Sequence, residues 1–251
     1  MKRKDSDKIR IWALCCWLLL WQLASMILDQ PILLPTPLAA LKALFAMLGA
    51  AGFWISIGHS TGRIILGFVI GTVCGCIFAV LALACPAVRS LLRPPVVLIK
   101  STPVVSFIIL ALVWIKSANL SIFIPALMVF PPVYLNVQEG LISADRKLLE
   151  MADVFSVPFS RRLSGIYIPA CLPHFRAACS LALGLCWKSG IAAEVIGLPR
   201  DTAGFNLYQA KIYLETPELF AWTAVIILVS VLFEKLFMLG LGRITGKYAV
   251  K

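Results

Sequence analysis

The chain has 251 residues, of which 61% are hydrophobic, 14% are charged and eight are cysteines. Soluble domains are about 45–50% apolar and about 25% charged, so this composition excludes an ordinary soluble protein and indicates a polytopic membrane protein. The net charge of +11 does not indicate nucleic-acid binding, because the basic residues lie between apolar segments and not on one soluble face.

Six apolar segments follow one another along the chain, and each is long enough to cross a membrane as a helix. The sequence therefore predicts an all-α polytopic membrane protein with six transmembrane helices. The predicted spans are Ile11–Leu28, Ser60–Ala84, Val96–Trp114, Leu120–Gln138, Ala170–Ile196 and Pro217–Leu239. An external amphipathic segment is expected around residues 38–48. Residues 85–95, 117–119 and 197–216 are expected to be turns or loops.

The second span carries three glycines, Gly67, Gly71 and Gly75, spaced four residues apart. Such a stripe of small residues lets another helix approach closely, either within one bundle or across a dimer. Arg63 lies near the outer end of this span, where a long side chain can reach the membrane surface.

The longest polar interruption is the loop at residues 141–169. Leu148, Met151, Ala152 and Phe155 recur at i, i+3, i+4 and i+7, which predicts a short helix with one apolar face. A second short helix follows after a turn. The apolar face must be buried on the bundle itself, at the lipid interface, or on a partner protein. A loop that merely joins two spans at the interface is the simpler alternative.

Three residues predict where these two short helices begin. Asp145 is a candidate N-cap for the first helix. Ser156 is a candidate cap for the second, and Pro158 suits its first turn.

The charge distribution predicts the orientation of the spans. If the N-terminus is cytoplasmic, most lysines and arginines fall in the inner segments, as the positive-inside rule requires. The predicted outer segments hold only Lys42, Arg63, Lys116, Arg200 and Lys211. This orientation places both termini and the 141–169 loop in the cytoplasm.

Nothing in the sequence predicts an enzyme. The two histidines are far apart, no cysteine pair has metal-ligand spacing, and no phosphate-binding GxxxxGK[ST] motif is present. No catalytic or metal-binding residue is therefore predicted. Charges within spans are functional candidates by default, so Lys188 and Glu194 are candidate pathway or gate residues, together with Arg63. Lys188 and Glu194 are six residues apart, which does not place them on one helical face.

The 141–169 loop resembles the cytoplasmic coupling loop of binding-protein-dependent ABC importer permeases. That pattern is Glu-Ala-Ala, three residues, Gly, nine residues, Ile-x-Leu-Pro, and the spacing matches throughout. Met151 replaces an alanine and Ser156 replaces the glycine, which in the family permits a tight turn. By resemblance, the coupling-loop residues are Glu150, Met151, Ala152, Ser156, Gly165, Ile166, Ile168 and Pro169.

Two further motifs are similar to one branch of the family, which imports nitrate, taurine, other sulfonates and some thiamine precursors. Residues 60–63 followed by Gly67-Phe68 match Ser-x-x-Arg-x-x-x-Gly-Phe, and Ala193-Glu194 matches the pair that ends the fifth span. Residues 114–116, Trp-Ile-Lys, depart from the Trp-Phe-Gly common in that branch.

The resemblance implies a type I ABC importer permease bundle in the inner membrane. Residues 1–54 would form the cytoplasmic N-terminus, first helix and external segment, 55–240 the core, and 241–251 a basic tail. The implied partners are an ABC ATPase dimer, an extracytoplasmic solute-binding protein, membrane lipid and a second permease copy, which would form a homodimer with this chain. No nucleic acid is expected as a partner. ATP and Mg would bind the ATPase, and this chain would bind no cofactor. The alternative is a secondary transporter or channel that works without an ATPase. A third possibility is a membrane scaffold that transports nothing.

Overall fold

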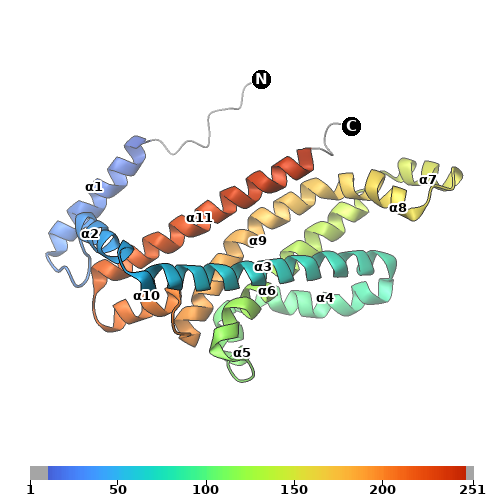
Figure 1. Ribbon diagram of the computed structural model, residues 1–251. Coiled ribbons are helices and arrows are strands. Elements are labelled where there is room, and N and C mark those ends of the chain that lie inside the picture. The colour runs from blue at the N-terminus through green and yellow to red at the C-terminus, as the bar shows by residue number, and fades with distance from the viewer. Residues whose placement is uncertain (1–10, 247–251) are drawn as a thin grey trace.

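The computed structural model describes residues 11–246, and all regular elements in this range are helical (Figure 1). They are α1 (Ile11–Leu28), α2 (Pro37–Leu48), α3 (Ala51–Ala84), α4 (Pro86–Ser101), α5 (Val104–Ala111), α6 (Ser117–Ile142), α7 (Arg146–Val154), α8 (Phe159–Arg162), the π-helical turn η1 (Leu163–Tyr167), α9 (Ile168–Gly197), α10 (Ala203–Ile212) and α11 (Thr216–Gly246). The predicted N-terminal segment 1–10 and the end of the basic tail lie outside the described residues.

Four helical segments of the described chain are long and apolar enough to cross a membrane. They are Ala51–Ala84, Ser117–Ile142, Phe159–Gly197 and Thr216–Arg243. The bent pair α4–α5 could make a fifth crossing. Helix α1 has the bounds of the predicted first span, and its stretch Cys15–Leu28, like α2, is a shorter apolar helical segment. The fold is thus an all-α, multi-pass membrane bundle, and the count of six spans stays a prediction.

The predicted third span, Val96–Trp114, is broken by a sharp bend, and whether it crosses the membrane stays a prediction. The chain bends by 106° between α4 and α5, at Thr102-Pro103. Thr102 is extended, with ψ 133°, because a following proline excludes the helical region. Helix α4 begins at Pro86, so the predicted turn at 85–95 is also helical, and Pro86 suits the first helical turn.

Two other predicted loops are helical. Residues 117–119 form the first turn of α6, which then continues without a break past Pro131. The predicted loop at 197–216 contains α10, whose N-cap Thr202 accepts a hydrogen bond from Phe205 N at 3.2 Å. Helix propensity and the helix-breaking glycine and proline residues did not predict α10, because the helix depends on contacts with α3 and α9, described below.

The glycine stripe packs within the chain, against α6. A Cβ atom at Gly67 would lie 2.4 Å from the Ile122 carbonyl oxygen, and one at Gly71 would lie 2.6 Å from that of Ala126. Gly75 is similarly close to the next turn of α6. The contacts advance along both helices together, so α3 and α6 run parallel. Of the two alternatives for this stripe, the structure shows packing inside one bundle.

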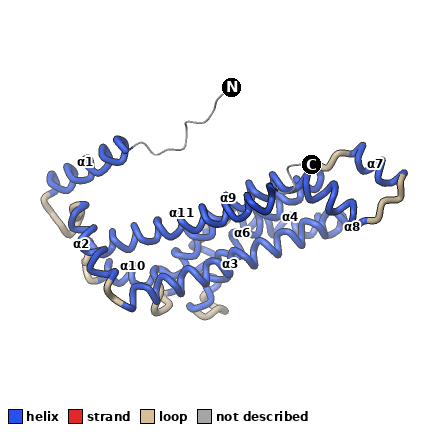
Figure 2. Tube along the Cα trace, turned by 45° about the horizontal axis from the view of Figure 1, so that its top comes forward, coloured by secondary structure: helices blue, strands red, loops and turns tan. Residues whose placement is uncertain are grey.

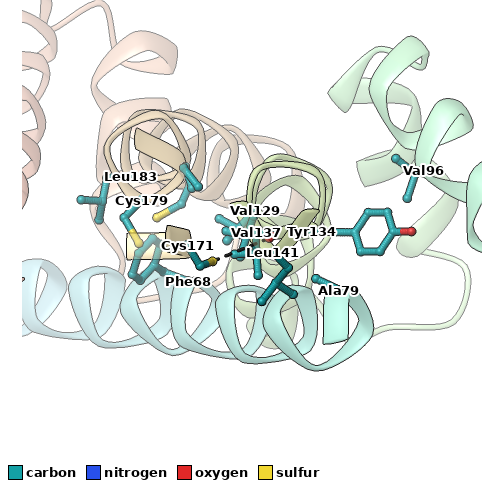
Figure 3. Packing of buried hydrophobic residues seen from close by; sticks show 14 of the residues in the cluster. Phe68, Ala79, Val96, Val129, Tyr134, Val137, Leu141, Cys171, Cys179 and Leu183 are labelled. Atoms are coloured by element: carbon teal, nitrogen blue, oxygen red, sulfur yellow. Dashed lines mark hydrogen bonds between the residues drawn. The ribbon is translucent and has the colours of Figure 1, made fainter. Parts of the chain in front are cut away.

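The bundle has two distinct ends. Figure 2 shows α7 and α8 at one end, and α2 and α10 at the other. The core between them lies where α3, α6 and α9 meet (Figure 3). It includes Phe68, Val129, Val137, Leu141, Cys179 and Leu183. All eight cysteines are unpaired, and Cys171, Cys179 and Cys186 are buried as small apolar residues, as expected.

We predict that Gly67→Ala destabilises the protein by about 1–3 kcal/mol, because its new methyl group meets the backbone of α6. Gly62→Ala is the matched control, since a Cβ there meets nothing within 4 Å. The control should be neutral or stabilising by up to about 1 kcal/mol, as alanine is the better helix former. Thermal unfolding of the purified full chain in detergent measures both. Equal stability of the two variants would contradict the packing role of the stripe.

Candidate functional site

The loop between α6 and α9 is a helical hairpin whose first helix is capped as predicted. Asp145 precedes α7, and its Oδ1 accepts a hydrogen bond from Lys147 N at 2.9 Å. This contact satisfies one of the free N–H groups at the helix start and places a negative charge at the positive end of the helix dipole.

The hairpin turns at Ser156, which has a left-handed backbone with φ 51°. Ser156 N donates to Asp153 O at 3.0 Å, and Val157 N donates to Ala152 O at 2.9 Å. These two bonds form a Schellman motif that ends α7. The predicted cap role of Ser156 is therefore wrong: it closes the first helix, and Pro158 is the N-cap of α8. Serine adopts here the positive φ for which glycine is suited.

Arg162 joins the two halves of the hairpin. Its Nη2 donates to Ala152 O at 3.0 Å and its Nε donates to Val157 O at 2.6 Å. Its Nη1 also pairs with the Asp153 carboxylate. The guanidinium thus binds one carbonyl in the last turn of α7 and one in the turn that follows, where the helix dipole favours a cation. No predicted role fell on Arg162, because backbone carbonyls give no side-chain pattern.

The hairpin presents an exposed apolar surface, which we call the hairpin patch. Its members are large apolar side chains, with exposed fractions in parentheses: Leu148 (42%), Met151 (52%), Val154 (81%), Phe155 (73%) and Phe159 (66%). Of the predicted apolar face, only Ala152 is buried, at 3% exposure. The bundle itself therefore does not cover this patch, which leaves lipid or a partner protein. The Glu150 side chain is 73% exposed beside the patch and lies 4.0 Å from Arg146.

The remaining loop residues do not lie in the turn. Gly165, Ile166, Ile168 and Pro169 belong to η1 and the start of α9, which continue α8 as one helical segment from Phe159 to Gly197. The predicted fifth span thus begins about three turns earlier than Ala170.

At the other end of the bundle, Glu194 is fully buried and caps α10. Ser60 Oγ donates to Glu194 Oε2 at 2.7 Å, and Gly204 N donates to the same oxygen at 3.0 Å. Ser60 Oγ in turn accepts from Ala203 N at 2.8 Å. Two free N–H groups at the start of α10 are thereby satisfied by α3 and α9, and a carboxylate faces the positive end of the helix dipole.

Arg63 belongs to the same neighbourhood. Arg63 and Ser121 both lie close to the Glu194 carboxyl group. Arg63 Nη1 is buried without a hydrogen-bond partner among the described residues, and so is Glu194 Oε1. Arg63 Nη1 is thus turned into the bundle, and the expected reach of this side chain to the membrane surface stays a prediction.

Close packing fixes α10 against α9. A Cβ at Gly204 would lie 2.4 Å from Glu194 Cβ and 3.1 Å from Ile191 O. The structure therefore brings together residues that the sequence presents as separate motifs, Ser60 and Arg63 on α3 and Glu194 on α9. Gly204 and Thr202 had no predicted role, since only the tertiary contact requires a glycine and a cap there.

Lys188 does not join this network. It lies on the exposed face of α9, one turn beyond Leu185 and two beyond Leu181, while Glu194 faces the interior. The structure thus separates the two candidate charges on α9. In the described chain Lys188 forms no ion pair.

Comparison with known proteins supplies independent information. The family model described as "binding-protein-dependent transport system inner membrane component" matches residues 71–244. The taurine transport system permease protein of Escherichia coli is 27% identical over 220 residues, covering 85% of this chain and 80% of that protein. A putative aliphatic sulfonates transport permease protein of Bacillus subtilis is 27% identical over 189 residues, covering 75% and 68%. A similarly named Escherichia coli protein is 28% identical over 199 residues, covering 78% and 75%.

We predict that Ser156→Gly stabilises the hairpin by about 1 kcal/mol, because a left-handed backbone costs a residue with a Cβ atom about that much more than glycine. Hydrogen exchange at the Phe155 and Val157 amides should slow about fivefold. Ser160→Gly is the control, since Ser160 lies within helix α8, where glycine is unfavourable. Faster exchange in Ser156→Gly than in wild type would contradict the assigned turn.

We predict that Glu194→Ala lowers the free energy of unfolding by about 2–3 kcal/mol, because Ser60 Oγ and Gly204 N lose a buried acceptor. Glu194→Gln retains an acceptor oxygen and should cost less than half as much. Thermal unfolding in detergent compares the two variants with wild type. If alanine and glutamine proved equally tolerated, the capping role of the carboxylate would be wrong.

Proposed function

The chain belongs to the family of binding-protein-dependent transport system inner membrane components, and from this premise we propose that its hairpin couples it to a separate ATPase during solute import. Members are multi-pass membrane permeases that work with an ATPase and a solute-binding protein. The related proteins are named as transport permease proteins. Under this proposal ATP and Mg bind the partner ATPase, and this chain binds neither.

The hairpin patch is the observation that carries the proposal. Its five large apolar side chains project from one end of the bundle, on a hairpin whose turn and ends are fixed by Asp145, Ser156 and Arg162. A rigid, exposed apolar surface indicates a protein or membrane contact. Because α8 continues into α9 without a break, a partner that moves the hairpin also moves a membrane-spanning helix. This arrangement suits mechanical coupling.

The proposed topology has six spans, with α1 as the first and the bent pair α4–α5 as the third. Both termini are cytoplasmic, and the hairpin lies on the same side. Support comes from the charge distribution, which places most basic residues at this end. The Glu194 network then lies at the outer end, where it holds α10 in place.

The exposed position of Lys188 supports the proposal that a second permease copy packs against this chain. An uncompensated charge facing lipid at the centre of a span costs about 2.5–3.5 kcal/mol on insertion scales. Lys188 is exposed on the face of α9 that also carries Leu181 and Leu185. A homodimer with α9 at its interface would remove Lys188 from lipid and turn it toward a shared pathway. Lys188 is thus the candidate pathway residue, whereas Arg63 and Glu194 serve structure.

The proposed substrate is a small organic anion, and a sulfonate fits best. The relatives are named for taurine and aliphatic sulfonates, both of which carry a sulfonate group. Two copies of Lys188 would supply positive charge along the pathway. An anion crossing a low-dielectric medium requires such compensation.

The test is purification of the tagged full chain from its native membrane in mild detergent, with mass spectrometry of the proteins retained. Wild type should retain a stoichiometric ATPase that contains a GxxxxGK[ST] motif. Phe155→Asp and Glu150→Arg should each reduce this retention at least tenfold, because a buried apolar contact or a complementary charge is lost.

Tyr213→Asp is the matched control, since Tyr213 is 69% exposed at the opposite end of the bundle. It should retain the ATPase as wild type does. Full retention by Phe155→Asp would overturn the hairpin as the docking element. Absence of any ATPase from wild type under several gentle conditions would favour the secondary transporter.

A further inference from the structure

A second feature of the bundle is a cavity of about 550 Å³ between α4 and α6. Three basic residues of α4 line it, Arg89, Arg93 and Lys100, and α6 contributes Tyr134 and Gln138. The cavity has no part in the hairpin or in the Glu194 network. It lies toward the end of the bundle that carries the hairpin, where α3 passes into α4 (Figure 1).

The basic residues form one face of α4. Arg89 and Arg93 are one turn apart, with a rise of about 6 Å, so both guanidiniums can contact one small group. Lys100 lies about two turns further on the same face. No acidic residue lines the cavity, and none of the three cations forms an ion pair within the described residues. All three side chains are exposed, so α4 forms an open wall of uncompensated positive charge.

The wall from α6 supplies neutral hydrogen-bond donors. Gln138 is 8% exposed, and its Nε2 has no hydrogen-bond partner among the described residues. Buried amide donors are almost always paired, so an unpaired one indicates a missing acceptor. Figure 3 shows Tyr134 extending from α6 toward Val96 on α4, with its hydroxyl at the far tip. An amide and a phenol beside two guanidiniums match an oxyanion.

We propose that this cavity binds the anionic group of a phosphate, sulfonate or carboxylate ligand. Arg89 and Arg93 supply the charge and the planar forks that suit such a group, Lys100 extends the positive field, and Gln138 donates from the opposite wall. Water could satisfy the Gln138 amide, but it would leave the cations unneutralised. Two sources share this chemistry: the phosphate of an anionic lipid, which basic pockets between spans bind at the cytoplasmic side, and a free small anion.

The lipid arm of the test uses native mass spectrometry of the full chain, titrated with phosphatidylglycerol or phosphatidylcholine. Wild type should prefer phosphatidylglycerol, and Arg89→Gln with Arg93→Gln should weaken that preference at least tenfold, as two charge-assisted contacts are removed. The matched control is Lys235→Gln with Arg243→Gln, which removes the same charge from α11 at the same end of the bundle. The control should bind as wild type does.

The free-anion arm uses the chain in nanodiscs of phosphatidylcholine alone, titrated calorimetrically with inorganic phosphate and with methanesulfonate. Binding lost in the Arg89/Arg93 double variant but kept in the control identifies a soluble-anion site. Preference for phosphatidylglycerol without such binding identifies a lipid site. If the double variant matches the control in both arms, the proposal is overturned. Neither arm measures transport or an ATPase, so the outcome is independent of the proposed function.

Gln138→Met separates binding from folding. Methionine is of similar size and removes the unpaired donor, so the variant should be at least as thermally stable as wild type. It should nevertheless weaken binding about threefold or more in whichever of the two titrations, lipid or free anion, shows binding by wild type. Unchanged binding in Gln138→Met would remove Gln138 from the site, and with it the argument from the unpaired amide.

Discussion

The close contact between α3 and α6 determines much of the remaining structure. In a membrane, apolar side chains gain little by leaving lipid, so helices associate through close van der Waals packing. Gly67, Gly71 and Gly75 let the backbone of α6 approach without an intervening side chain. This parallel pair then forms a groove into which α9 fits, with Gly190 against Ile64 and Gly140 against Cys171. The two ends of the bundle are built on this three-helix centre.

Both ends use the same physical device, a side chain from elsewhere that satisfies a helix terminus. At one end, the Glu194 carboxylate and the Ser60 hydroxyl accept from the first N–H groups of α10. At the other, the Arg162 guanidinium donates to one carbonyl in the last turn of α7 and to one just beyond it. The signs of charge follow the helix dipole in each case, anion at the N-terminus and cation at the C-terminus. Short helices outside the main bundle are thereby held in fixed positions.

The surface of a single chain is incomplete in two places. The hairpin patch exposes apolar side chains outside the bundle, and Lys188 places a charge on an exposed apolar face of α9. Each is costly in the environment of an isolated subunit, and each would be relieved by the partners that we propose, an ATPase at the hairpin and a second permease copy along α9. The chemistry of the exposed residues thus describes a subunit of a larger assembly.

Composition and spacing alone determined the all-α membrane class, the glycine stripe and the Asp145 cap, because hydrophobic length, small-residue periodicity and capping depend on residues near in sequence. The family was indicated by the resemblance of residues 150–169 to a known motif. Other features depended on contacts that no local pattern contains. Helix α10 required the folded chain, as did the Arg162 contacts with carbonyls. The meeting of Ser60, Arg63 and Glu194 was likewise decided by tertiary structure, because residues more than 130 positions apart come together only when α3, α9 and α10 pack.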